Sequence, residues 1–158
     1  SMWAEKLGIA ELVTGDEELV TDLTTMLQSV ETDMTIFFRL LSSISEPEVS
    51  HLEHAFYDPA SIPVDEFNDW LGRWWSRAGG KPDQGRMRLA NPKYVLRNWM
   101  AQLAIDAAEK NDYSVANELY ELLKSPYEEQ PESEGEWFQK RPEWARHRVG
   151  CSMLSCSS

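Results

Sequence analysis

The sequence has only two cysteines, and both lie near its end, at Cys151 and Cys156. Small secreted proteins held together by disulfides contain many more, so a disulfide framework is excluded. No uncharged apolar run approaches the roughly 18 residues that a membrane-spanning helix needs. The first residues also lack the basic, apolar and small-residue pattern of a secretory signal. We therefore expect a chain with no membrane partner.

Basic residues are scarce as well, with 15 Lys and Arg against 27 Asp and Glu and a net charge of −12. Binding to nucleic acid takes most of its affinity from neutralised phosphates, so we expect no nucleic-acid partner. Residues 81–97 are a local exception, with five bases and one acid. This stretch is typical of a solvated loop, or alternatively of a docking surface. The candidate docking residues are Arg86, Arg88, Lys93 and Arg97.

Sequence motifs for catalysis are also missing: there is no glycine-rich phosphate loop, Ser–His–Asp constellation or zinc-finger spacing. His51 and His54 are three residues apart on an expected helix, but no third metal ligand is nearby. Trp70, Trp74 and Trp75 recur at helical spacing, which favours core packing over ligand stacking. We therefore assign no catalytic residue, no metal site and no cofactor to this chain.

Apolar residues recur at helical spacing along the chain, and no stretch alternates like a strand. The sequence therefore predicts an all-α fold, a single bundle of about seven helices with an irregular C-terminal tail. A polar connector is expected over residues 81–90. The expected helices cover residues 3–13, 17–31, 34–44, 47–56, 63–78, 92–110 and 114–124.

The longest helical pattern runs from Pro92 to Lys110. Asn91 is a suitable N-cap, and proline fits the first helical position because it has no N–H to leave unpaired. At about 1.5 Å per residue this helix would be roughly 28 Å long, enough to span a small domain. We predict that it is the central helix and that Trp99 on its apolar side is buried.

The composition changes after Pro126, since residues 127–136 include five glutamates. This predicts an irregular surface segment. We expect a helical bundle over residues 1–125. Residues 126–158 would then be an acidic irregular segment and a cysteine-containing tail packed on the same domain by Trp137, Phe138 and Trp144.

The two cysteines of this tail are the candidates for redox or disulfide chemistry. Cys156 lies near a chain end, where a thiol is expected to be accessible to thiol–disulfide exchange. Cys151 is five residues away, and this spacing is unsuitable for a bridge across an ideal helix. The spacing alone favours an inert tail.

Several blocks of the sequence resemble the selenoprotein O family, the YdiU-like proteins. The matching blocks are Lys6–Gly8, Asn91–Asn98 with Ala101–Gln102 and Ala104–Ile105, residues 125–132, and Ser155–Ser158. Some family members carry selenocysteine third from the end, where this chain has Cys156. The resemblance covers nearly the whole chain and is weakest over residues 134–153.

The resemblance implies a function that this chain does not carry alone. Members of the family resemble protein kinases but are described as protein adenylyltransferases. They move AMP from ATP to Ser, Thr or Tyr hydroxyls of other proteins, with Mg or Mn ions. The catalytic and nucleotide-binding residues belong to a kinase-like core that precedes the matching region, so none can be assigned here.

The resemblance therefore implies a C-terminal accessory helical domain, with the kinase-like core of the same polypeptide and the protein substrates of the parent as partners. Cys156 alone matches a position with a proposed role, a redox one. The expected location is cytoplasmic for a prokaryotic parent, with a mitochondrial one possible for a eukaryotic parent. The alternative is an autonomous helical protein-binding module without an enzymatic role.

Overall fold

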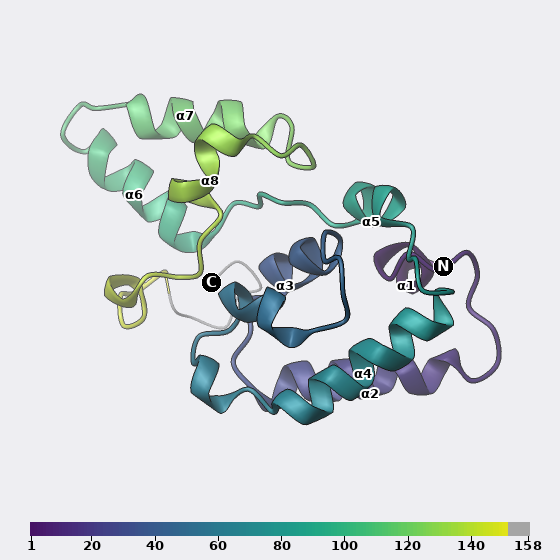
Figure 1. Cartoon of the computed structure of the whole chain (residues 1–158). Coiled ribbons are helices and arrows are strands. Elements are labelled where there is room, and N and C mark those ends of the chain that lie inside the picture. The colour runs from purple at the N-terminus through teal and green to yellow at the C-terminus, as the bar shows by residue number, and fades with distance from the viewer. Residues whose placement is uncertain (152–158) are drawn as a thin grey trace. The chain divides into compact units, whose positions relative to one another are not determined.

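The structure, a computed structural model, describes residues 1–151 (Figure 1). All regular elements of these residues are helical, so the predicted all-α class is confirmed. The helices belong to two compact units. Unit 1 is Ser1–Asn91, and unit 2 begins at Pro92. The expected bounds of the bundle and of the tail, 1–125 and 126–158, stay a prediction.

Unit 1 contains five α-helices and two short 3₁₀ helices among its described residues. The helices are α1 (Met2–Lys6), α2 (Asp16–Ser29), α3 (Met34–Leu41), η1 (Val49–Ala55), η2 (Pro59–Ser61), α4 (Val64–Arg77) and α5 (Gln84–Ala90). The expected cap of α3 is confirmed, because the Asp33 carboxylate accepts a hydrogen bond from the Ile36 N–H at 3.0 Å. The expected stop of α4 is also confirmed, since Gly79 and Gly80 both have positive φ.

Four predictions for unit 1 are wrong in detail. The first helix ends at Lys6, because Gly8 adopts a left-handed conformation two residues later. The third ends at Leu41, and the fourth is the 3₁₀ helix η1. The expected connector over residues 81–90 contains α5, whose first turn is capped when Asp83 accepts from the Arg86 N–H.

Aromatic residues form the core of unit 1, where α2 and α4 lie side by side (Figure 1). Trp70 and Trp74 are fully buried and stack with their ring centroids 5.9 Å apart. Their indole N–H groups donate to the carbonyls of Leu19 and Leu7, both at 2.8 Å. Trp75 differs from the prediction, because it is only half-buried.

Unit 2 contains α6 (Asn98–Ala108), α7 (Ser114–Leu123), α8 (Pro131–Trp137) and the 3₁₀ helix η3 (Glu143–Ala145). The expected hairpin of α6 and α7 is confirmed. Trp99 is buried as predicted, and its ring stacks on Trp137 with centroids 5.9 Å apart. Phe138 is also buried, but Trp144 is 44% exposed. The acidic segment is not wholly irregular, because it contains α8.

The predicted helix start at Pro92 is wrong. Asn91 is the residue after α5 and has extended dihedral angles, with φ −118° and ψ 99°. The backbone N–H groups of Lys93 and Tyr94 both donate to the carbonyl of Pro126, at 2.8 and 3.1 Å. A helix would direct these groups along its own axis, so this tertiary contact keeps the segment extended until α6 begins at Asn98. No helix within residues 1–151 is long and apolar enough to cross a membrane.

Candidate functional site

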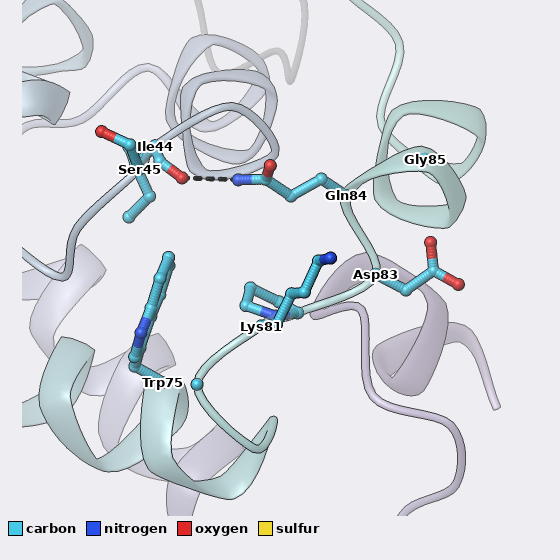
Figure 2. Close-up of a pocket in the computed structure, with 9 residues that line it drawn as sticks. Ile44, Ser45, Trp75, Lys81, Asp83, Gln84 and Gly85 are labelled. Atoms are coloured by element: carbon cyan, nitrogen blue, oxygen red, sulfur yellow. Dashed lines mark hydrogen bonds between the residues drawn. The ribbon is translucent and has the colours of Figure 1, made fainter.

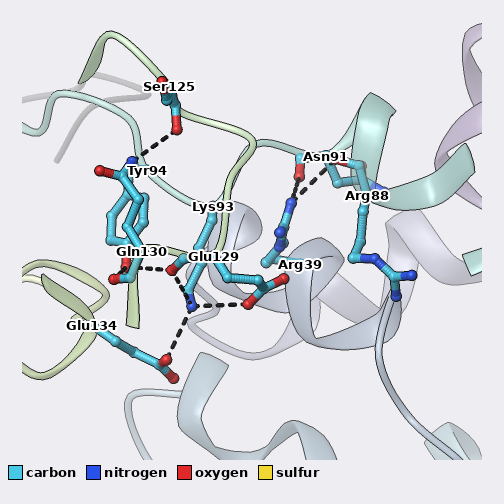
Figure 3. A network of polar contacts seen from close by, with 9 residues as sticks. All are labelled: Arg39, Arg88, Asn91, Lys93, Tyr94, Ser125, Glu129, Gln130 and Glu134. Carbon is cyan, nitrogen blue, oxygen red and sulfur yellow. Dashed lines mark hydrogen bonds and ion pairs between the residues drawn. The ribbon is translucent and has the colours of Figure 1, made fainter. Parts of the chain in front are cut away.

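Two of the blocks that resemble the selenoprotein O family meet in unit 1. The Lys6 ammonium donates to the Asn91 side-chain carbonyl at 3.0 Å, and the Asn91 amide donates back to the Lys6 carbonyl at 3.1 Å. Lys6 also lies 4.3 Å from the centroid of the Phe38 ring, and burial lowers its pKa. The Arg39 guanidinium donates to the Asn91 backbone carbonyl at 3.0 Å (Figure 3). Asn91 is thus held through both its side chain and its backbone.

Gly8, at the end of the first block, allows a close approach of two backbone segments. Its φ is +64°, and its carbonyl accepts from the Asp83 N–H at 3.0 Å. A Cβ at this position would lie 2.8 Å from the Met87 sulfur and 2.9 Å from the Asp83 nitrogen. Only glycine fits this backbone without displacing α5.

Lys93 is the centre of a polar network in unit 2 (Figure 3). Its side chain is 3% exposed, and its ammonium donates to the Glu129 carbonyl at 2.8 Å. It also pairs with the carboxylates of Glu129 and Glu134, at 3.1 and 3.0 Å. Burial acts to lower the pKa of Lys93, but the hydrogen bonds that its ammonium donates to these two carboxylates outweigh burial, so the pKa is raised.

Tyr94 and Gln130 complete the Lys93 network. The Tyr94 hydroxyl lies 3.1 and 3.0 Å from the carbonyls of Glu129 and Gln130, and burial raises its pKa. Gln130 has a left-handed backbone, with φ 39°. Its side-chain amide donates to the carbonyls of Leu122 and Ser125, at 3.0 and 2.8 Å. These contacts fix the turn between α7 and α8.

The Lys93 network joins the block Asn91–Asn98 to the block at residues 125–132. Its ammonium, hydroxyl and amide groups all bind partners within unit 2. The contacts between these two blocks therefore stabilise unit 2.

Replacing Lys93 with methionine is expected to lower the free energy of unfolding at pH 7 by about 1–3 kcal/mol, since buried hydrogen bonds of a charged group are lost. The cost stays moderate because the partner carboxylates of Glu129 and Glu134 are exposed enough to be hydrated again. Because the folded pKa lies above 10.5, the Lys93 contribution is complete at neutral pH. It should decline as the pH rises above that value.

Urea denaturation of the unsubstituted chain and of the Lys93→Met variant, at pH 7 and above pH 10.5, tests this expectation. Lys124→Met is the matched control, because Lys124 is 51% exposed and pairs with Glu121 on the surface of α7. It should cost less than about 0.5 kcal/mol. Equal costs for the two substitutions would contradict the stabilising role of Lys93.

The four candidate docking residues are divided between the units. Arg86 donates to the carbonyls of Ile9 and Ala10, both at 3.2 Å, and Arg88 donates to the Ser42 carbonyl at 3.1 Å. Lys93 and Arg97 are buried in unit 2, with 4% and 5% exposure. A docking role for the four residues stays a prediction.

The other candidate residues are placed as follows. Cys151 is a fully buried free thiol, and Cys156 lies outside the described residues. His51 is exposed and lies 2.8 Å from a Glu46 carboxylate oxygen, and His54 is exposed as well. Within residues 1–151, no group of three or more His, Cys, Asp and Glu side chains could hold a metal ion.

A pocket of about 660 Å³ opens in unit 1 between the chain after α3, the end of α4 and the start of α5 (Figure 2). Trp75 and Lys81 lie on opposite sides of it. The Gln84 amide donates to the Ile44 carbonyl at 2.5 Å, and this hydrogen bond links two segments that line the pocket. This pocket could not be predicted from the sequence, because Trp75 has the same helical spacing as the two core tryptophans.

Comparisons with known proteins agree with the resemblance. A family model described as "Protein adenylyltransferase SelO" matches residues 1–124. The chain is 48% identical to a protein nucleotidyltransferase YdiU of Flavobacterium johnsoniae, over 99% of this chain and 32% of that protein. It is 46% identical to one of Rhodopirellula baltica, over 100% of this chain and 34% of that protein. The chain thus spans about a third of the length of these curated relatives, and it belongs to the SelO family.

Proposed function

We propose that this chain is the C-terminal accessory helical domain of a protein adenylyltransferase. In this proposal, the kinase-like core that moves AMP from ATP to protein hydroxyls lies outside the sequence, together with the sites for ATP and Mg or Mn. The observation that carries the proposal is the family match combined with its coverage. The chain aligns along almost its whole length, yet with only about a third of each relative.

The outer side of α6 supports a role in packing against the rest of a larger protein. Trp99 and Met100 are buried on the inner side of this helix. Ala101, Ile105 and Ala108 follow at helical spacing on the opposite side, where Ile105 is 51% exposed. A helix that is apolar on two sides normally buries both. We infer that the kinase-like core covers this outer side.

Label transfer from ATP tests the proposed function. With Mg or Mn and generic protein acceptors, the chain alone should transfer no label, whereas the full polypeptide containing it should transfer AMP. Ile105→Glu in the full polypeptide should reduce transfer or make the polypeptide more sensitive to proteolysis, because it places a charge in the inferred contact. The same substitution in the isolated chain should leave its unfolding unchanged.

Leu89→Glu is the control, since Leu89 is a 77% exposed apolar residue on α5, in the other unit. It should affect neither transfer nor proteolysis. Robust transfer by the isolated chain would contradict the accessory role. An Ile105→Glu polypeptide that matches the unsubstituted one in both assays would contradict the contact at α6.

We also propose that Cys156 forms a reversible disulfide with a cysteine of the kinase-like core. Support comes from its position, which it shares with the selenocysteine of some family members. Joining two thiols in this way releases two protons and two electrons, which an oxidant such as glutathione disulfide accepts.

In the isolated chain, Cys156 is expected to react quickly with iodoacetamide without reductant, because its proposed partner is absent. Cys151 should be protected in the folded chain, because it is fully buried. Mass spectrometry of the alkylated peptides distinguishes the two, and both should react in guanidinium chloride. A folded chain in which Cys156 is neither alkylated nor in a disulfide would contradict the redox role.

A further inference from the structure

We propose that the pocket between Trp75 and Lys81 in unit 1 binds a flat aromatic anion of nucleotide size, with its ring against Trp75 and its anionic group near Lys81. This inference concerns a ligand of the chain itself, so it does not depend on the proposed transferase. It rests on two unengaged donor groups that face the same cavity (Figure 2).

Trp75 is the first of these groups. The other two tryptophans of α4 are fully buried and donate to backbone carbonyls, whereas Trp75 is half-buried. Within residues 1–151 its indole N–H has no hydrogen-bond partner. Its ring contacts Trp74 at 74°, edge to face, with centroids 5.7 Å apart. Figure 2 shows the indole standing as one wall of the pocket, a position suited to stacking with another ring.

Lys81 is the second group. The nearby Arg73 and Arg77 form ion pairs with Asp22 and Asp16, at 2.9 and 2.8 Å. The exposed Lys81 ammonium has no ion pair or hydrogen bond within the described residues 1–151. An anionic ligand would therefore displace only water from it and gain a charge-assisted hydrogen bond.

The charged residues that line the pocket are one base, Lys81, and one acid, Asp83. Figure 2 shows the Asp83 carboxylate directed away from Trp75, and it accepts the Arg86 backbone N–H at 3.0 Å. Asp83 is therefore occupied in capping α5, and it does not face the proposed anion.

The size of the cavity sets the size of the ligand. A volume of about 660 Å³ is far more than one ion fills, and it lies within the range of pockets that hold small organic ligands. Trp75 offers a flat apolar surface and Lys81 offers one positive charge. A nucleotide combines the matching parts, a flat ring and a phosphate, at about this size.

Calorimetric titration with guanosine 5′-monophosphate tests the inference. This probe differs from the nucleotide of the proposed transfer reaction, so a failure here leaves the transferase proposal intact. We expect saturable binding of one nucleotide per chain. Trp75→Leu and Lys81→Gln should each weaken the affinity by about fivefold or more, as loss of a stacking surface or of a charged hydrogen bond predicts.

Two matched variants are the controls. Trp75→Phe keeps a ring and should bind within about threefold of the unsubstituted chain, which also covers the case in which Trp75→Leu does not fold. Lys110→Gln removes the same charge from an exposed position after α6 and should leave the affinity unchanged. Circular dichroism verifies that each variant is folded.

Four outcomes would overturn the inference. They are the absence of saturable binding at millimolar nucleotide, equal affinities for the Lys81→Gln and Lys110→Gln variants, binding of inorganic phosphate as tight as that of the nucleotide, and binding of guanosine as tight as that of the nucleotide. The third outcome would show that Trp75 contributes nothing, and the fourth that Lys81 contributes nothing.

Discussion

Replacing Trp74 with alanine is expected to lower the free energy of unfolding of unit 1 by about 3–5 kcal/mol. The side chain is fully buried, and its ring is almost parallel to that of Trp70, with an interplanar angle of 10°. Its indole N–H donates to the Leu7 carbonyl at 2.8 Å. The substitution therefore opens a large cavity and also leaves a buried carbonyl without its donor.

Urea denaturation followed by circular dichroism measures this cost. Trp74→Phe separates its two parts, because it keeps most of the ring volume but loses the hydrogen bond to Leu7, and it should cost about 1–3 kcal/mol. Trp75→Ala is the matched control one residue away, where the side chain is only half-buried. If Trp74→Ala cost no more than Trp75→Ala, the assignment of Trp74 to the core would be wrong.

In unit 2, Trp99→Ala is expected to lower the free energy of unfolding by about 3–5 kcal/mol as well. Trp99 is 4% exposed, and its ring stacks on Trp137 at an interplanar angle of 24°. Removing it takes away one half of the aromatic pair that joins α6 to α8. A cost below about 1 kcal/mol would place Trp99 on the surface instead.

The phenylalanine variants of the two tryptophans should differ. Within residues 1–151, the buried Trp99 N–H has no hydrogen-bond partner, so Trp99→Phe loses none. It should therefore cost less than Trp74→Phe, which leaves the Leu7 carbonyl unpaired. The opposite order would show that hydrogen bonding does not distinguish these two sites.

Helices whose signals are local could be predicted from the sequence. In α4, a run of aromatic residues at helical spacing is followed directly by two glycines, and the helix ends where the pattern predicts. In α3, the Asp33 cap lies within the same few residues as the groups it binds. In α5 the signal is weak, because Gly85, Arg86 and Arg88 make a short helix look like a polar connector.

Features that depend on distant contacts could not be predicted in this way. Asn91–Pro92 has the composition of a helix start, but the segment after it is extended because Lys93 and Tyr94 donate to the carbonyl of Pro126. Pro126 is too far along the sequence for a local pattern to reveal this contact. The family blocks at Lys6–Gly8, Asn91–Asn98 and 125–132 were recognised one by one. That their side chains hydrogen-bond one another became visible only in the structure, in the Lys6–Asn91 pair and the Lys93 network.

The hydrogen bonds from Lys93 and Tyr94 to Pro126 have a consequence for biosynthesis. Pro126 is added to the growing chain about 30 residues after this segment, which corresponds to a few seconds of translation. Until then the backbone N–H groups of Lys93 and Tyr94 lack this acceptor, so the native contacts of the segment before α6 cannot form. Unit 2 is therefore completed late, whereas every residue of unit 1 has been synthesised once Asn91 is in place.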